Sequence, residues 1–213
     1  MPAAAGSEAG MISSLKRLQM RQMPAAGLEP LEANCELCGT SMSEDHRHLL
    51  QLDERAIVCV CESCWALRSG DAEYRPTGSR VLWLDDFALP DELWARLRIP
   101  ISLAFFLATG GGVVAFYPSP AGATESELDM GVWTDLCAVN PVLEELEPEA
   151  EVLIVNRFAD QRAYAIAPTD EAYRLVGLVK ASWEGISGGT ALEGVVKGFF
   201  EQLRARAATG RAP

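Results

Sequence analysis

Hydrophobic and polar positions alternate along several short stretches of this chain, and the pattern predicts antiparallel hairpins. Three pairs of apolar stretches are each joined by a short turn or loop, and they lie at residues 49–60, 101–117 and 151–167. In the first pair, Asp53-Glu54-Arg55 supplies the turn; in the second, a run of three glycines does so. A further short apolar strand is predicted at residues 81–84.

Apolar residues recur at helical spacing in four other segments, which are residues 90–97, 133–139, 169–183 and 190–203. The first begins with a proline followed by two acidic residues, an arrangement that suits the positive end of a helix. Thr169 is expected to cap the third helix. The chain therefore combines hairpins with separate amphipathic helices.

Two capping-box patterns, a threonine followed three residues later by a glutamate, predict helix starts. Thr190 and Glu193 mark the start of the last helix, and Thr124 and Glu127 predict another start near residue 124. The proline- and glycine-rich segment 118–126 before it is expected to be a loop long enough to bind a peptide.

The order of these elements indicates an α+β fold. Strands and helices do not alternate strictly, which favours an antiparallel sheet packed by helices. A polar segment at 71–80 separates this domain from a cysteine-rich stretch before it. We therefore divide the chain into a flexible tail at 1–32, a metal-binding module at 33–70, an α+β domain at 71–208 and a disordered end at 209–213.

The N-terminal tail is rich in alanine, glycine and proline. Within it, Met11, Ile12, Leu15 and Leu18 fall on one helical face, and Pro24 ends the pattern. A helix of about three turns is only marginally stable alone. The segment is either a frayed tail or a locally basic docking peptide that becomes ordered on a partner.

Two Cys-x-x-Cys pairs form the strongest chemical signal in the sequence, with Gly39 after the first pair allowing a tight turn. The four cysteines are Cys35, Cys38, Cys61 and Cys64. Four thiolates at this spacing are typical of one tetrahedral zinc site. With a turn, a hairpin and then ligands at a helix start, the stretch predicts a small treble-clef or zinc-ribbon-like module. Iron in a rubredoxin-like site would use the same ligands and stays an alternative.

Three further potential ligands, Cys59, His46 and His48, exceed what one tetrahedral ion needs. Cys59 and Cys61 are expected on one face of a strand, where they would compete as ligands. The histidines could hydrogen-bond to the primary ligands, one of them could replace a thiolate, or the group could bind a second metal.

The net charge of −12 disfavours binding to nucleic acid, because an acidic surface repels phosphate groups. No apolar run approaches the length of about 20 residues that a membrane span needs, and no signal peptide is recognisable. Thiols clustered at metal-ligand spacing suit a reducing compartment. These features lead us to expect a cytoplasmic protein.

A catalytic constellation is difficult to assemble from this sequence. Both histidines belong to the cysteine-rich stretch, so a hydrolytic dyad would have to take its base from there. The carboxylate pairs Asp85-Asp86 and Glu144-Glu145 consist of adjacent residues, which usually point apart. We therefore lean towards a protein that is not an enzyme.

Several motifs together resemble an uncharacterised bacterial protein family whose genes lie beside those of nickel–iron hydrogenases, particularly the high-affinity uptake type. The resemblance covers residues 34 to about 203, and its most distinctive string is Tyr-Pro-Ser-Pro-Ala-Gly-Ala-Thr-Glu-Ser at 117–126. The other motifs lie at residues 35–39, 46–49, 59–64, 155–157 and 183–189. The resemblance implies a role in hydrogenase biogenesis or function, but it supplies no residue roles.

Our leading hypothesis is a non-catalytic zinc-binding accessory protein that contacts a hydrogenase subunit or maturation factor. The alternative is a rubredoxin-like iron electron carrier that serves a hydrogenase.

Overall fold

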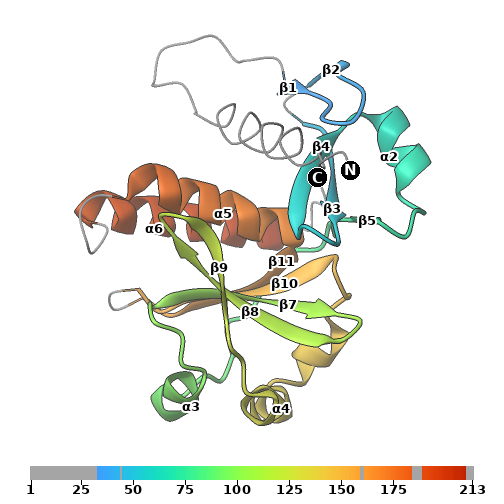
Figure 1. The fold of residues 1–213 in the computed structure, drawn as a ribbon. Helices are drawn as coiled ribbons and strands as arrows, with labels where there is room; N and C mark the ends of the chain where they lie inside the picture. Colours follow the sequence, from blue (N-terminus) through green and yellow to red (C-terminus); the bar gives the residue numbers. More distant parts are fainter. Residues whose placement is uncertain (1–32, 44, 159–160, 184–188, 210–213) are drawn as a thin grey trace, which may run out of the picture.

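Antiparallel strands form the frame of the molecule in a computed structural model that describes residues 33–43, 45–158, 161–183 and 189–209. Within these residues the strands form a six-stranded, a three-stranded and a two-stranded sheet, in which every pairing is antiparallel. Helices pack on the largest sheet (Figure 1). The predicted α+β class is therefore confirmed.

The six-stranded sheet has the order β6-β11-β10-β7-β8-β9. Its strands are β6 (Leu82–Trp83), β7 (Leu103–Thr109), β8 (Gly112–Ser119), β9 (Gly122–Ser126), β10 (Glu151–Asn156) and β11 (Ala163–Pro168). Every residue of β10 and β11 is buried. Strands covered on both faces explain why these two segments are almost continuously apolar.

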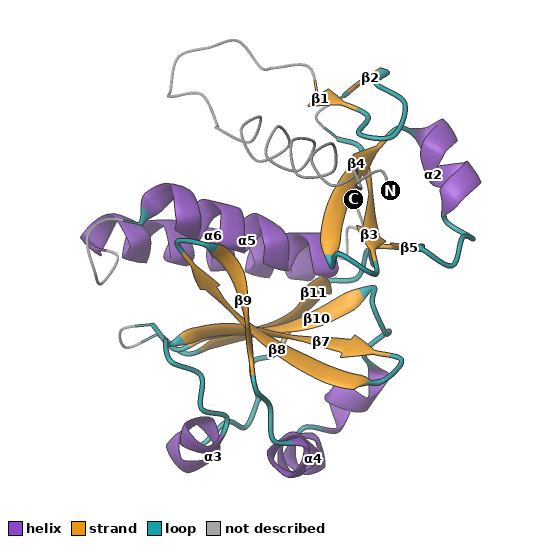
Figure 2. Ribbon diagram, viewed as in Figure 1, coloured by secondary structure: helices purple, strands orange, loops and turns teal. Residues whose placement is uncertain are grey.

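Helices cover both faces of this sheet, with α5 and α6 on one face and α3 and α4 near the other (Figure 1, Figure 2). Their bounds are α3 (Asp91–Arg96), α4 (Met130–Val139), α5 (Thr169–Ser182) and α6 (Gly189–Thr209), with a short 3-10 helix η1 (Pro141–Glu145) after α4. The four helical segments predicted from periodicity are thus present.

Adjacent residues of β7 serve two separate cores, as the period of two in a strand requires. Phe105 stacks on Phe116 with ring centroids 5.0 Å apart, in the core beneath α5 and α6. Phe106 faces the other side, where its ring lies 5.5 Å from that of Trp133 in α4. Both phenylalanines are fully buried. The sheet is therefore the middle layer of three.

The cysteine-rich stretch forms a smaller unit built on the sheet β4-β3-β5. Its elements are β1 (Ala33–Asn34), β2 (Ser41–Met42), β3 (Arg47–Gln51), β4 (Ala56–Val60), α2 (Glu62–Arg68) and β5 (Tyr74–Pro76). The predicted hairpin and short helix are both present. β5 pairs with β3, so the polar segment at 71–80 contributes a strand to the module beyond residue 70.

The module packs directly against the larger domain. Leu50 of β3 is buried in the same core as Phe105. The hydroxyl of Tyr173 in α5 donates to the carbonyl oxygen of Arg55 in the hairpin turn, and Arg55 pairs with Glu125 of β9 at 2.6 Å. These contacts join the two units into one packed structure.

The predicted helix start at Thr124 is wrong, because residues 122–126 form the edge strand β9. Ser119 and Thr124 share a hydrogen bond of 2.9 Å that closes the turn between β8 and β9, and Gly122 has a φ of +120°. The following helix α4 begins at Met130, and Asp129 caps it by accepting from the amide of Gly131. Segment 118–126 is thus a hairpin instead of an open loop.

Capping of α5 by Thr169 is also wrong. Pro168 occupies the cap position, and the Thr169 hydroxyl donates instead to the carbonyl oxygen of Glu149. The predicted tail at 1–32 lies outside the described residues, as do residues 184–188 and 210–213, whereas α6 extends to Thr209.

Candidate metal centre

The structure brings Cys35, Cys38, Cys61 and Cys64 together, with their four sulfur atoms within 4.8 Å of one another. The Sγ atoms of Cys38 and Cys61 are 3.7 Å apart. A tetrahedral ion with metal–sulfur bonds of about 2.3 Å keeps its sulfurs about 3.8 Å apart. The sulfurs are thus close to the geometry that one ion requires, and the zinc-ribbon-like module is confirmed.

Backbone turns place each cysteine pair. In the first pair, the amide of Gly39 donates to the carbonyl oxygen of Cys35 at 2.8 Å, and Gly39 adopts a φ of +78° that favours glycine. In the second pair, Cys61 is the N-cap of α2, and its sulfur accepts from the amide of Cys64 at 3.5 Å. The positive end of α2 therefore lies beside the sulfur atoms of Cys61 and Cys64, where it would favour their ionised forms.

Hydrogen bonds within the metal-free cluster give its thiols different pKa values. Hydrogen bonds from the side chain and backbone of Thr40 lower the pKa of Cys38 to about 6. A hydrogen bond to the Cys38 sulfur, supported by burial, raises the pKa of Cys64 to about 12. Four thiolates so close together repel one another unless a cation neutralises them, so a metal ion would remove this competition for protons.

The module has a small hydrophobic core of its own. Its buried members are Cys35, Leu49, Val58, Val60 and Tyr74. Such a core is too small to hold a fold of this size without further support. A metal ion at the four cysteines and the contact with the larger domain are two sources of that support.

Cys59 does not compete with Cys61, contrary to the prediction that both lie on one strand face. β4 ends at Val60, and Cys61 turns into the helix cap. Cys59 instead forms a second group with His46 and His48, whose potential ligand atoms also lie within 4.8 Å of one another. The seven candidate ligands therefore divide into a set of four and a set of three.

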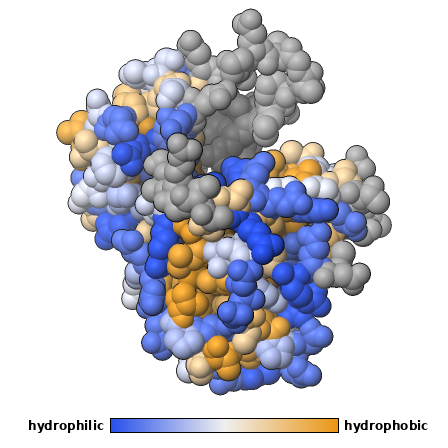
Figure 3. All heavy atoms as spheres, turned by 180° about the vertical axis from the view of Figure 1, so that it is seen from behind, coloured by the Kyte–Doolittle hydropathy of each residue, from blue (hydrophilic) through white to orange (hydrophobic). Residues whose placement is uncertain are grey.

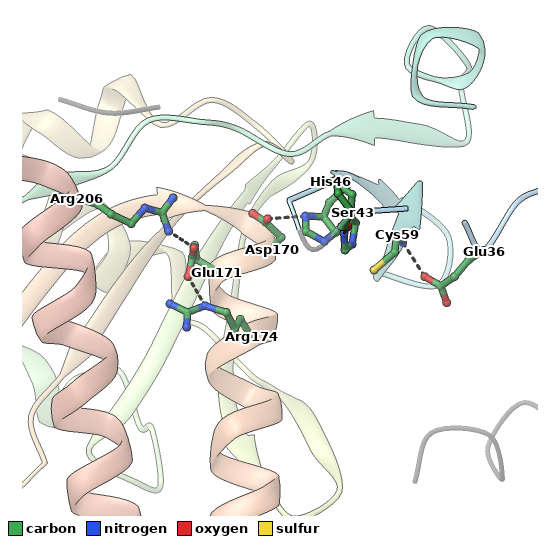
Figure 4. A network of polar contacts seen from close by, with 9 residues as sticks. Glu36, Ser43, His46, Cys59, Asp170, Glu171, Arg174 and Arg206 are labelled. Carbon is green, nitrogen blue, oxygen red and sulfur yellow. Dashed lines mark hydrogen bonds and ion pairs between the residues drawn. The ribbon is translucent and has the colours of Figure 1, made fainter. Parts of the chain in front are cut away.

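The second group lies where the module meets α5. Nδ1 of His48 is 2.9 Å from an Asp170 oxygen, and Nδ1 of His46 is 2.9 Å from the carbonyl oxygen of Ser43. Figure 4 shows the Asp170 side chain extending from α5 towards the histidine rings of the module. Cys59 comes from the neighbouring strand, where its amide donates to Glu36 at 2.6 Å.

The pKa of His48 is shifted by burial and by two neighbours, Asp170 and Cys59. Burial of the ring opposes its charging, but Asp170 and Cys59 more than offset this and raise the pKa of His48 to about 10. Asp170 was not predicted as a site residue, because its only sequence feature is an acidic side chain in the first turn of a helix. Its contact with His48 depends on how the module packs on the domain.

The other carboxylate candidates are surface groups. Asp85 accepts from the indole of Trp83 and pairs with Arg204 at 3.4 Å, and Glu145 pairs with Arg80 at 3.5 Å. The side chains of Asp85 and Glu145 are 70% and 66% exposed. Within the part of the chain that the structure describes, no helix is long and apolar enough to cross a membrane.

The fold and this site define an α+β protein with a four-cysteine candidate metal module. The chain belongs to the family described as a family of unknown function, DUF5947, whose model matches residues 34–207. Neither the comparison with curated proteins nor that with solved structures gives a match.

Proposed function

We propose that the four-cysteine set binds zinc as a structural ion and that the protein is a non-catalytic accessory protein. Four thiolates complete a tetrahedral shell and leave no position for a substrate. Comparable sites contribute about 10–16 kcal/mol to the folding of small zinc-dependent peptides. The ion then holds the first turn and α2 in place for contact with a partner.

The exposed helix α2 is the observation that carries this proposal. None of its seven residues is buried. Leu67 of α2 is 76% exposed, and Leu37, between the first two cysteines, is 37% exposed. A short helix fixed by a metal ion and displaying leucine is a suitable contact surface for another protein.

A groove in the larger domain offers a second contact region. It has a volume of about 550 Å³, and its lining combines aromatic rings with arginines, namely Trp83, Phe87, Tyr164, Arg157, Arg162 and Arg204. These residue types are enriched at protein–protein interfaces. On the back of the molecule, hydrophobic residues gather over its lower part (Figure 3).

We further propose a hydrogenase subunit or maturation factor as the partner. This step is supported by the resemblance of the motifs at 35–39, 59–64 and 117–126 to the hydrogenase-associated family. The role would be in assembly, maturation or regulation of a nickel–iron hydrogenase in the cytoplasm.

Capture from a hydrogenase-producing host tests this proposal. Tagged wild-type protein should retain a hydrogenase subunit or maturation factor, and Leu67→Glu should lose it, because the change places a charge on the contact surface. Met130→Glu is the matched control, since Met130 is also exposed, at 47%, but lies on α4. Capture of no such protein by the wild type, together with unchanged hydrogenase activity on gene deletion, would contradict the proposal.

Metal analysis of the purified protein distinguishes a structural zinc site from a rubredoxin-like iron site. Aerobically purified protein should be colourless with zinc at the four cysteines. A red protein with stoichiometric iron would instead establish the rubredoxin-like electron carrier.

A further inference from the structure

The group formed by His46, His48 and Cys59 has the features of a second metal site. It combines two imidazoles and one thiolate whose candidate ligand atoms lie within 4.8 Å of one another. Ligands of a tetrahedral ion at bond lengths of about 2.0–2.3 Å lie about 3.3–3.8 Å apart. Side-chain movements of about 1 Å would therefore bring all three donors onto one ion.

Both histidines have Nδ1 fixed by a partner, which assigns Nε2 as the atom that would bind a metal ion. The Ser43 carbonyl can only accept, so Nδ1 of His46 carries the proton and Nε2 carries the free lone pair. Asp170 holds Nδ1 of His48 at 2.9 Å, so an ion that displaced the other proton of the ring would bind Nε2. Metal-bound histidines almost always have their second nitrogen fixed by such a carbonyl or carboxylate.

One of these nitrogens has no partner among the residues that the structure describes. Nε2 of His46 is buried and forms no hydrogen bond with any of them. A buried acceptor without a partner costs about 1–3 kcal/mol, so this arrangement needs an explanation. A bound cation would satisfy it.

The site opens onto a cavity between the module and the domain. The cavity has a volume of about 370 Å³, and its lining includes His46, His48 and Asp170 together with Arg47 and Arg206. Two of the three proposed ligands, His46 and His48, thus line the cavity. Three protein ligands leave a fourth position of a tetrahedral ion open, as in catalytic zinc sites. The four-cysteine set has no such position.

We propose that His46, His48 and Cys59 bind a second, exchangeable divalent transition-metal ion through two Nε2 atoms and one Sγ atom. Imidazole and thiolate donors select zinc-like ions over magnesium or calcium, which prefer oxygen. Asp170 is a positioning residue that orients His48 and does not bind the ion. The fourth ligand is water or a small donor from the cavity.

Metal stoichiometry tests this site without reference to any partner. Reduced wild-type protein, reconstituted with zinc and desalted, should hold two ions per chain, and Cys59→Ser or His46→Ala should hold one. Cys137→Ser is the matched control, because Cys137 is a free cysteine outside both groups and the variant should keep two ions. One ion per chain in the wild type, or two in Cys59→Ser and His46→Ala, would overturn the proposal.

The absorption spectrum of cobalt-substituted protein identifies the ligands. A retained four-thiolate spectrum also shows that a variant is folded. Cys59→Ser should keep the full charge-transfer spectrum of a four-thiolate cobalt site and lose only the additional single-thiolate band of the wild type. Asp170→Asn should weaken cobalt binding at the second site by about 10–100-fold while leaving the first site unchanged. Azide should change only the spectrum of cobalt at the second site, because only that site has an open position. A second-site spectrum that azide leaves unchanged would refute the open position.

Discussion

Leu49 and Leu50 are neighbours in β3 that pack in different cores. Substituting each with alanine should show how much each core contributes to the stability of its own unit. Leu49 packs in the module core, whereas Leu50 packs in the core beneath α5 and α6. Their exposed fractions are 0% and 1%. The two variants therefore remove the same side chain, at the same burial, from opposite faces of one strand.

Each substitution should lower the free energy of unfolding of the unit that it touches by about 2–5 kcal/mol, the usual cost of replacing a buried leucine with alanine. A domain of this size has a total stability of about 5–15 kcal/mol, so the loss is large but tolerable. Leu50→Ala should destabilise the larger domain and its contact with the module. Leu49→Ala should mainly destabilise the module.

Denaturant titrations with two signals distinguish these outcomes. Zinc release, followed with a chromogenic chelator, reports on the module, and far-ultraviolet circular dichroism reports mainly on the larger domain. Leu49→Ala should move zinc release to lower denaturant and leave most of the dichroism transition in place. Leu50→Ala should move the dichroism transition itself.

Equal shifts of the dichroism transition in the two variants would refute the separation into two cores. The same conclusion would follow if Leu50→Ala changed neither signal.

Three further outcomes follow from single contacts. Gly78→Ala should destabilise the fold by about 1–3 kcal/mol, because the new Cβ would lie 2.9 Å from a backbone carbonyl oxygen, as measured by thermal unfolding. Asn140→Ala should cost about 1–3 kcal/mol in the same assay, since the buried amide side chain makes three hydrogen bonds, two of them to the backbone before α3. In metal-free protein at pH 7, iodoacetamide should modify Cys38 much faster than Cys64, because the pKa of Cys38 is about 6 and that of Cys64 about 12. Mass spectrometry of the digested protein measures this difference, which should widen as the pH rises from 5 to 7 and Cys38 ionises.

Each of these predictions has a control. Gly177 lies within α5 with open space around it, so Gly177→Ala should be neutral or stabilise the helix by up to about 1 kcal/mol. Asn140→Asp keeps the acceptor for the Ala88 amide and should cost less than alanine. Bound zinc should protect both cysteines, and equal labelling of Cys38 and Cys64 in the metal-free protein would contradict the assignment.

The hairpins could be predicted because their signals are local. Strands 151–156 and 163–167 are apolar on both faces, and their pairing needs only a short connection. The four-cysteine group could likewise be predicted from spacing alone, because the two cysteines of each pair lie on one local turn.

The errors arose where a local signal had more than one meaning. Thr124 and Glu127 have capping-box spacing, but Thr124 uses its hydroxyl to close a hairpin turn with Ser119. Asp129 provides the cap instead. A threonine before a glutamate does not reveal which backbone amides will be left without partners, because that depends on where β9 pairs.

Asp170 could not be identified from the sequence for a different reason. Its partner His48 is distant in the chain, and the contact forms only after the module packs on α5. The same packing brings the cavity into existence. Residue spacing carries no information about this contact, so the division of the seven ligands into two groups was visible only in three dimensions.

The first turn of α5 connects the two histidines to the far end of the chain. Asp170 binds His48, and the next residue, Glu171, pairs with Arg174 at 2.7 Å and with Arg206 of α6 (Figure 4). Glu171 is only 8% exposed, so these charges are coupled through a poorly solvated region.

An ion at the proposed second site would therefore be linked to the position of the C-terminal helix, and thermodynamic linkage requires such an effect to be reciprocal. A protein that displaced α6 on binding would alter the affinity of the histidine–cysteine group for its ion by the same factor by which the ion alters the affinity of that protein. With an ion bound, α5 would be the element that couples the proposed second site to the C-terminal helix.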